Sequence, residues 1–271
     1  MSDAQPILDH IVLFVSYETL QELPEKLKEH FKIIPGGGST TGVTINKLLI
    51  LPDGTYLEIV AFNKGIEPER REAHRWSNAT EGTVIDWAYT LNNPDEFEHI
   101  QRRVNSSESG VLYQKLVSGG RRRPDGVELK WSVILPVGAH QNRLQPGIAP
   151  FWCLDKTPRS LRVPYLAEDG KQPATCTQHP CGAQSVSMLE VLVPHALQPK
   201  IGKAYASIHT NAQGGRAWGY GTHGDSELAG GLVALGESPD STVKITLTLK
   251  GDKSQKITIL PGVKITVTNG N

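Results

Sequence analysis

Two strand-like segments near the N-terminus each carry one residue that could take part in chemistry. Residues 8–15 read Leu-Asp-His-Ile-Val-Leu-Phe-Val and place His10 in an apolar run, and residues 54–60 do the same with Glu58. An imidazole and a carboxylate are ligands for a divalent metal, and both are costly to bury without a partner. The pattern therefore predicts a metal site, a buried hydrogen-bonded pair, or a Glu58 that simply faces water.

The spacing within each segment predicts which side chains share a face. Side chains on a strand point the same way when they are an even number of positions apart. We therefore expect Leu8 to accompany His10, and Tyr56 to accompany Glu58, on one wall of a cavity.

A basic turn in the middle of the chain is a second candidate for chemistry. Arg121-Arg122-Arg123 is followed by Pro124-Asp125-Gly126, and the strand-like run after it contains Glu128. We expect Arg123 to bind the carboxylate or enolate of a substrate, because a guanidinium can form two parallel hydrogen bonds with such a group. Glu128 would act as a general base or form an ion pair with Arg123. A solvated hairpin turn is the alternative for the whole segment.

Three tryptophans extend the candidate site into the second half of the chain. Trp87, Trp131 and Trp152 could line an apolar substrate cavity, and large core aromatics would give the same pattern.

Composition and charge restrict the class of protein. Lys plus Arg and Asp plus Glu both number 28, so no general field attracts nucleic acid or an acidic membrane surface. No apolar run has membrane-spanning length, and the number of cysteines is odd. We expect a reduced, cytoplasmic protein that binds a small molecule and neither nucleic acid nor membrane.

The elements that must position these residues follow from periodicity and breaker residues. A strand over 7–15, a helix over 17–31 with Pro24 in its first turn, and strands over 32–35, 45–51 and 55–62 make a βαβββ module, assigned to residues 1–62.

The same order recurs in a second module, assigned to residues 83–155. Its strands are expected at 84–91, 112–117, 127–135 and 151–154, with a helix at 95–104. Asp9 and Asp86 stand at comparable places, which gives a repeat offset of 77 residues.

The rest of the chain is expected to be a loop and a divergent module. Residues 156–185 form a connecting loop, and residues 186–271 form a third, β-rich module in which 243–249 and 257–259 make a half-exposed hairpin. The predicted fold is α+β, with paired βαβββ modules forming curled mixed sheets around a cavity and a β-rich C-terminal section.

The modules and three motifs resemble a known family. The repeated βαβββ order, with a His in the first strand and a Glu in the fourth, resembles the vicinal oxygen chelate superfamily of glyoxalases, extradiol dioxygenases and antibiotic-resistance proteins. More closely, the chain resembles the glyoxalase-like domain family, through Leu8-Asp9-His10, the Arg-Pro-Asp-Gly stretch of 123–131, and His179-Pro180. The resemblance covers about residues 7 to 193.

The resemblance implies a metal at the floor of a cavity. His10 and Glu58 occupy the ligand positions of the first module, whereas the second module has Trp87 at the counterpart of His10 and no His or Glu in its last strand. His179 would then supply the third ligand. The set leaves a position open for Lewis-acid chemistry and fits zinc, iron, manganese or nickel. At a position matching the family pattern, Asn46 would bind a substrate oxygen.

The implied function is a metal-dependent lyase or isomerase that acts on a small oxygenated metabolite. The ion would polarise a carbonyl or enolate while Glu58 or Glu128 moves a proton. The alternatives are a non-catalytic small-molecule binding protein of the resistance type and an iron-dependent dioxygenase. A homodimer is what the superfamily resemblance suggests.

Overall fold

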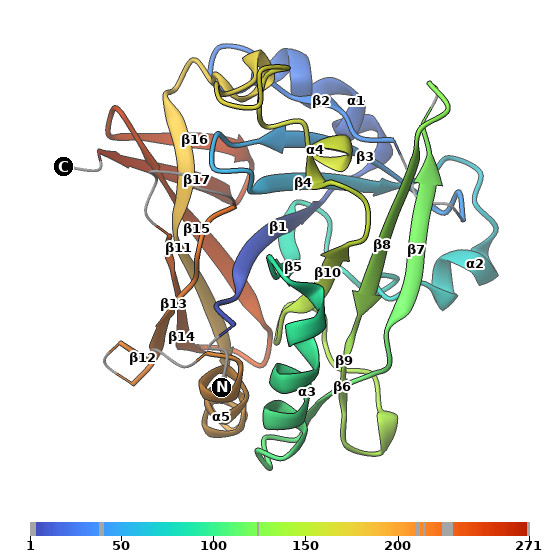
Figure 1. Cartoon of the computed structure of the whole chain (residues 1–271), viewed down its shortest axis with the longest axis vertical. Coiled ribbons are helices and arrows are strands. Elements are labelled where there is room, and N and C mark those ends of the chain that lie inside the picture. Colours follow the sequence, from blue (N-terminus) through green and yellow to red (C-terminus); the bar gives the residue numbers. More distant parts are fainter. Residues whose placement is uncertain are drawn as a thin grey trace.

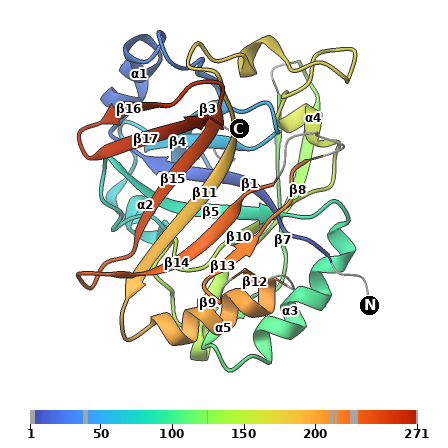
Figure 2. The same ribbon diagram turned by 90° about the vertical axis from the view of Figure 1, so that its left-hand side faces the viewer.

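The chain forms two large β-sheets, which cross each other in the computed structural model (Figures 1 and 2). The structure describes residues 4–37, 41–123, 125–209, 212–213, 215–223 and 230–269. Pro124 of the Arg-Pro-Asp-Gly motif lies outside these ranges.

The first βαβββ module is present in the predicted order. Its helix begins after Ser16, whose hydroxyl accepts a hydrogen bond from the Thr19 amide at 3.1 Å, and it packs Leu20 and Leu23 into the core. The helix ends five residues earlier than expected, and Pro24 lies in its last turn and not in its first. The elements are β1 (Ile7–Phe14), α1 (Tyr17–Lys26), β2 (Ile34–Pro35), β3 (Thr44–Ile50) and β4 (Tyr56–Phe62).

The second module follows the short helix α2 (Pro68–Ala73). The strand expected over 112–117 is divided in two: its start pairs with β9 in a small separate sheet, and its end leads into β7. The elements are β5 (Thr83–Thr90), a 3₁₀ turn (Pro94–Glu96), α3 (Phe97–Asn105), β6 (Val111–Tyr113), β7 (Val117–Arg122), β8 (Glu128–Ile134), β9 (Pro136–Gly138), a second 3₁₀ turn (Ala139–Gln141) and β10 (Phe151–Asp155).

The two modules share one eight-stranded sheet, in which each module's strands follow the same order outward from the centre. The strand order is β2-β3-β4-β1-β5-β10-β8-β7, so β1 and β5 lie antiparallel at the centre. In each half the first and last strands of the module run parallel, β1 with β4 and β5 with β10. The predicted α+β fold, with paired modules in a curled mixed sheet, is confirmed.

The C-terminal section repeats this connectivity in a second sheet of order β12-β13-β14-β11-β15-β17-β16. As in the first sheet, β11 is parallel to β14 and antiparallel to β15, and β15 is parallel to β17. The expected hairpin is wrong, because β16 pairs with β17, which lies between β16 and β15. The elements are α4 (Arg159–Arg162), a 3₁₀ turn (Thr175–Thr177), β11 (Ala183–Pro194), α5 (Gln198–Ile208), β12 (Ala212–Gln213), β13 (Ala217–Gly219), β14 (Leu232–Ser238), β15 (Lys244–Gly251), β16 (Gln255–Leu260) and β17 (Val263–Asn269).

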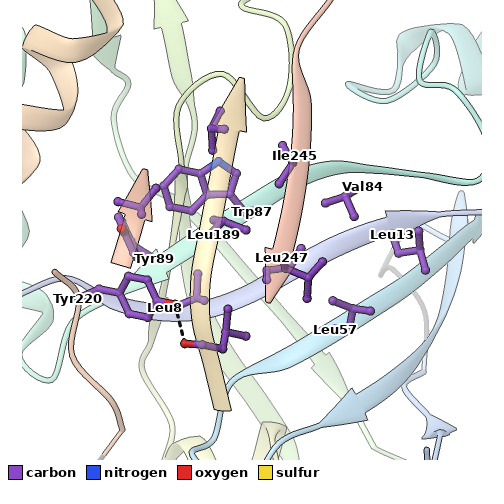
Figure 3. Close-up of a cluster of buried hydrophobic side chains, with 14 of the residues drawn as sticks. Leu8, Leu13, Leu57, Val84, Trp87, Tyr89, Leu189, Tyr220, Ile245 and Leu247 are labelled. Carbon is purple, nitrogen blue, oxygen red and sulfur yellow. Dashed lines mark hydrogen bonds between the residues drawn. The ribbon is translucent and has the colours of Figure 1, made fainter. Parts of the chain in front are cut away.

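The main core lies between the two sheets (Figure 3). Leu8 and Trp87 from the first sheet meet Leu189 and Leu247 from the second, and all four are almost fully buried. Helices α3 and α5 pack side by side along the lower edge of the sheets in Figure 2. None of the described helices is long and apolar enough to span a membrane, the longest having 11 residues.

Candidate functional site

A β-bulge in the first strand creates the local geometry of the site. Leu8 pairs with Tyr89 and His10 pairs with Ala88, so Asp9 is an extra residue on β1. The bulge breaks the even-spacing rule, and Leu8 points into the core between the sheets while His10 points to the opposite, concave face. The expectation that both line one wall is therefore wrong.

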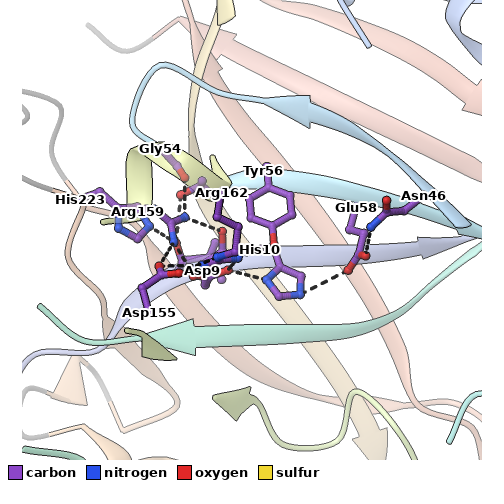
Figure 4. A network of polar contacts seen from close by, with 12 residues as sticks. Asp9, His10, Asn46, Gly54, Tyr56, Glu58, Asp155, Arg159, Arg162 and His223 are labelled. Atoms are coloured by element: carbon purple, nitrogen blue, oxygen red, sulfur yellow. Dashed lines mark hydrogen bonds and ion pairs between the residues drawn. The ribbon is translucent and has the colours of Figure 1, made fainter. Parts of the chain in front are cut away.

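His10 and Glu58 meet on the concave face, as drawn in Figure 4. The imidazole stacks on the Tyr56 ring at 4.8 Å between centroids, and its Nε2 lies 3.5 Å from Glu58 Oε2. Asn46 Nδ2 donates to the other oxygen, Glu58 Oε1, at 2.5 Å. The Glu58 side chain is 17% exposed and that of His10 is 5% exposed, so Glu58 is the member of the pair that a ligand can reach.

Asp9 fixes the imidazole from the other side. His10 Nδ1 lies 2.5 Å from Asp9 Oδ1, and the Asp9 carboxylate is fully buried. Burial alone would raise the pKa of Asp9, but the guanidinium groups of Arg159 and Arg162 outweigh it and hold this pKa well below the usual range. An ionised Asp9 can only accept, so the Nδ1 proton stays in place and Nε2 is the nitrogen that can gain or lose a proton toward Glu58.

The arginines that hold Asp9 come from α4, and sequence reasoning missed them. Arg159 Nη1 donates to Asp9 Oδ2 at 2.5 Å, and Arg162 Nη2 donates to the same oxygen at 2.8 Å. Arg162 also binds Asp155 and the Tyr56 hydroxyl. The sequence feature that could have identified them is their spacing of three residues, which puts both guanidiniums on one face of a helical turn. Their partner is some 150 residues away in the chain, so the sequence alone did not connect them.

Arg121 reaches the concave face in place of Arg123, the arginine predicted from the sequence. Gly119 pairs with Trp131 across β7 and β8, and Arg121 follows two residues later on the same face. Burial lowers the pKa of Arg121, and the nearby guanidiniums of Arg162 and Arg123 act in the same direction. Tyr56 and Glu58 act in the opposite direction, so both lie within electrostatic range of Arg121. Arg123 instead pairs with the exposed Asp125 at 2.6 Å.

The three tryptophans do not share a face. Trp131 is half-buried and packs against the concave-face cluster that contains Phe151 and Cys153. Trp87 and Trp152 are fully buried on the opposite face, in the core between the sheets, and Trp87 Nε1 donates to the Gly147 carbonyl at 3.0 Å. The structure therefore brings Trp131, but neither Trp87 nor Trp152, to the face that carries His10.

Glu128 and His179 also lie apart from the pair. The Glu128 side chain is 64% exposed and forms an ion pair with Lys130 at 3.1 Å. His179 accepts a hydrogen bond from the Lys32 amide at Nδ1 and donates to the Ile50 carbonyl from Nε2. Burial lowers the pKa of His179 to about 4, so it is neutral near pH 7. Through hydrogen bonds at both ring nitrogens, His179 connects the 175–182 segment to the first module.

Comparison with known proteins places the fold in a family. The model of the glyoxalase-like domain family matches residues 8–207. The chain belongs to this family. Among solved structures, a hypothetical protein from Staphylococcus aureus has a TM-score of 0.64 at 12% identity, covering 97% of this chain and 99% of its own.

A second solved structure resembles the chain over part of its own length. A xylose isomerase-like TIM barrel/4-hydroxyphenylpyruvate dioxygenase fusion protein has a TM-score of 0.51 at 11% identity, covering 93% of this chain and 38% of the fusion. At such identities, these likenesses establish the fold alone. No curated protein matches the chain.

The second module of this glyoxalase-like protein carries Asp86, and not Trp87, at the counterpart of His10. The bulge at Asp9 is matched by a bulge at Ile85 on β5, between the pairs Val12–Asp86 and Leu13–Val84. The repeat offset is therefore 76 residues, and the offset of 77 expected from the sequence is wrong by one. Asp86 is fully buried and paired with Arg75 at 2.6 Å, and its Oδ1 accepts from two backbone amides, those of residues 87 and 147.

The counterpart of Glu58 in the second module is Phe151. Val12 pairs with Glu58 in the first module, and Ala88 pairs with Phe151 in the second. The guanidinium of Arg75 lies over the Phe151 ring at 4.7 Å from its centroid. A paired cation and an aromatic ring thus occupy the half of the concave face opposite His10 and Glu58.

The donor groups do not fit the metal that the family resemblance implied. Within the described ranges, no group of three His, Cys, Asp or Glu side chains is placed to hold an ion. His10 Nε2 and Glu58 Oε2 face each other as two donors, but His179 uses both nitrogens on backbone groups and Asp86 is paired with Arg75. The predicted set of His10, Glu58 and His179 is not assembled, and we derive no step through a metal.

The second sheet copies the geometry of the site without its chemistry. Val186 pairs with Leu249 and Met188 pairs with Thr248, which makes Ser187 the bulge residue that corresponds to Asp9. By the same register, Met188 stands where β1 has His10, and Ala234 stands where β4 has Glu58. The site at His10 and Glu58 therefore has no chemical equivalent in the second sheet.

A surface hollow of about 690 Å³ lies away from these groups, beside α3 and β6. It has no carboxylate or imidazole in its lining. Its lining residues are Gln101, Asn105, Tyr113, Gln114, Lys115 and Gln141.

Proposed function

We propose that this glyoxalase-like protein is a lyase or isomerase that moves a proton on the carbon next to a carbonyl of a small oxygenated metabolite. The observation that carries the proposal is the chain of contacts from Asp9 through His10 to Glu58, which ends in a partly exposed carboxylate. A general base must be within reach of its substrate and coupled to a group that can receive or return the proton. Glu58 meets the first condition, and His10 Nε2 meets the second.

The reaction would proceed by breaking one C–H bond. Glu58 Oε2 takes the proton, the electron pair of the C–H bond moves to the carbonyl oxygen, and an enolate results. The proton can pass to His10 Nε2, where the ionised Asp9 stabilises the imidazolium that forms. Its return to the opposite face of the same carbon completes an isomerisation that inverts this centre. If the next carbon carries a leaving group, the enolate can instead re-form the carbonyl and expel that group with its bonding electron pair, which completes a lyase reaction.

The other functions considered from the sequence have less support. A hydrophobic pocket between Trp87, Trp131 and Trp152 would need three rings on one face, and two of them belong to the opposite core. A two-His, one-carboxylate iron site would need His179 beside His10, whereas its nitrogens are bonded to the Lys32 amide and the Ile50 carbonyl.

Deuterium exchange tests the proposed function even before the substrate is identified. We expect the protein to catalyse exchange of the C–H next to the carbonyl in a panel of small ketones and oxo acids in D₂O, measured by proton NMR. Glu58→Gln should reduce the exchange rate by about 100-fold or more, because general-base catalysis contributes that much. Glu128→Gln is the matched control, since Glu128 is exposed and paired with Lys130. Equal rates for the two variants would contradict the proposal.

A further inference from the structure

Arg121 differs from the other arginines around the site because it has no acidic partner in the part of the chain that the structure describes. Arg159 and Arg162 bind Asp9, Arg75 binds Asp86, and Arg123 binds Asp125, each with a closest contact of 2.8 Å or less. Among the described residues, no carboxylate lies within ion-pair distance of Arg121, whose hydrogen bond goes to the Gly36 carbonyl.

The backbone beside Arg121 is shaped to admit its guanidinium. A Cβ on Gly37 would overlap Arg121 Nη1, and Gly37 has a φ of +128°, which side-chain-bearing residues rarely adopt. Gly36 and Gly37 follow β2, at one edge of the curled sheet, whereas Arg121 is on β7 at the other edge. The guanidinium therefore reaches across the opening of the concave face, where it donates to the Gly36 carbonyl.

Glu58 is the complementary charge on the same face. Its carboxylate is partly exposed and is held by Asn46, yet it forms no ion pair with Arg121 within 4 Å. The two unlike charges attract each other electrostatically but do not touch. The half-buried ring of Trp131 lies on the same face as Arg121, and Phe151 packs edge-on against His10. A molecule between Arg121 and Glu58 would thus meet a fork of hydrogen-bond donors at one end and a base at the other.

We infer that the substrate is a short oxo acid, whose carboxylate binds Arg121 while Glu58 takes the proton from the carbon next to its carbonyl. This inference rests on the proposed function and adds the substrate class. For a 2-oxo acid, the C3–H bond breaks, the proton goes to Glu58, and the electron pair forms the enolate at the C2 oxygen. Arg121 also places positive charge beside the enolate as it forms.

Binding of 2-oxobutanoate and its uncharged methyl ester, measured by titration calorimetry, tests the role of Arg121. We expect the acid to bind the unaltered protein roughly 10-fold to 100-fold more tightly than the ester, as hydrogen bonds to charged groups allow. Arg121→Gln should remove this preference, and Arg121→Lys should retain part of it because the charge remains without the fork. Arg122→Gln is the matched control and should leave the preference unchanged, since Arg122 is exposed and donates to the Gly126 carbonyl of its own turn.

Several outcomes would overturn the inference. These are equal binding of acid and ester, no binding of either, or an unchanged preference in Arg121→Gln. If Arg121→Gln does not fold, the test rests on Arg121→Lys. An undiminished preference for the acid over the ester in Arg121→Lys would show that the paired hydrogen bonds of the guanidinium do not bind the carboxylate.

The deuterium exchange assay separates failure of this inference from failure of the proposed function. If exchange depends on Glu58 but is as fast with the ester as with the acid, only the carboxylate inference is contradicted. If binding of the acid depends on Arg121 but no Glu58-dependent exchange occurs, only the catalytic proposal is contradicted.

Discussion

Asp9 is a buried carboxylate that contacts two guanidiniums and an imidazole. Because each of these buried groups needs the others as partners, Asp9 holds the candidate site together. Its closest contacts with His10, Arg159 and Arg162 are 2.5 to 2.8 Å long, and the groups that make them come from β1 and α4. Removing one member of such a cluster leaves the other charges buried without a partner. Asp9 therefore serves both the stability of the fold and the orientation of His10.

Asp9→Asn should lower the free energy of unfolding at pH 7 by about 3–5 kcal/mol, the usual effect of breaking a buried ion pair. Urea denaturation measures this change. Asp125→Asn, which removes the exposed pair with Arg123, is the control and should change stability by less than about 1 kcal/mol. Similar losses in the two variants would mean that the Asp9 cluster contributes no more than a surface pair.

The face on which each residue lies was the least predictable feature, although its element was often correct. Alternation along a strand and helical spacing identify β1, β4, β5 and α3, because burying one face requires those periods. A bulge inserts one residue and reverses the faces beyond it, and no residue type marks its position. This is why Leu8 was assigned to the wrong face and why the second module was aligned one residue out, at Trp87 and not Asp86.

Contacts between distant elements were equally hard to predict. His10 and Glu58 lie together as expected, and Asn46 also contacts Glu58, because adjacent strands of one module position all three. Arg159 and Arg162 reach Asp9 from the short helix α4, and the inward direction of Arg121 depends on its register with β8. Register and loop path are set by tertiary packing, which one sequence does not reveal.

The turn between β3 and β4 contains a buried acid whose ionisation depends on the packing of both sheets. Asp53 accepts hydrogen bonds from Thr55, and its own amide donates to the Gln184 carbonyl of β11 in the second sheet. Burial raises the pKa of Asp53 from 3.8 to about 6. The folded protein therefore binds this proton more tightly than the unfolded chain, and stability from this group falls as pH rises from about 4 to 6.

Asp53→Asn should consequently affect stability more favourably at high pH than at low pH. The free energy of unfolding of the variant minus that of the unaltered protein should be more positive at pH 7.5 than at pH 4.5 by about 2–3 kcal/mol, since one pKa unit corresponds to about 1.4 kcal/mol. Chemical denaturation at the two pH values measures the difference. A difference that does not change with pH would show that the carboxyl ionises as easily in the folded protein as in the unfolded chain.

At the scale of the whole molecule, a neutral histidine joins the two sheets. His209, which follows α5, contacts the Tyr89 hydroxyl of the first sheet and donates from Nδ1 to the Gly219 carbonyl of the second. Burial lowers its pKa from 6.5 to about 4. Because the unfolded chain binds the proton first, the stability that His209 supports is complete above pH 6.5 and is lost as pH falls toward 4.

His209→Gln should therefore reduce the loss of stability between pH 7 and pH 4.5, by up to about 3 kcal/mol. Its amide can retain one of the two hydrogen bonds, so some loss of stability at pH 7 is expected as well. Thermal unfolding across this pH range measures both effects. An acid-induced loss as steep as that of the unaltered protein would assign it to other groups.

The bulge at Ser187 shows that the strand geometry can occur without the polar groups of the candidate site. The second sheet keeps the extra residue although Met188 and Ala234 give it no acid, base or arginine cluster to position. The bulge is thus common to both sheets, whereas the His10–Glu58 pair occurs in the first sheet and its register positions in the second hold Met188 and Ala234. The C-terminal sheet thus has the bulge without the polar groups, and substituting Asp, His and Glu at 187, 188 and 234 would show which contacts of the first site a bulged strand can position by itself.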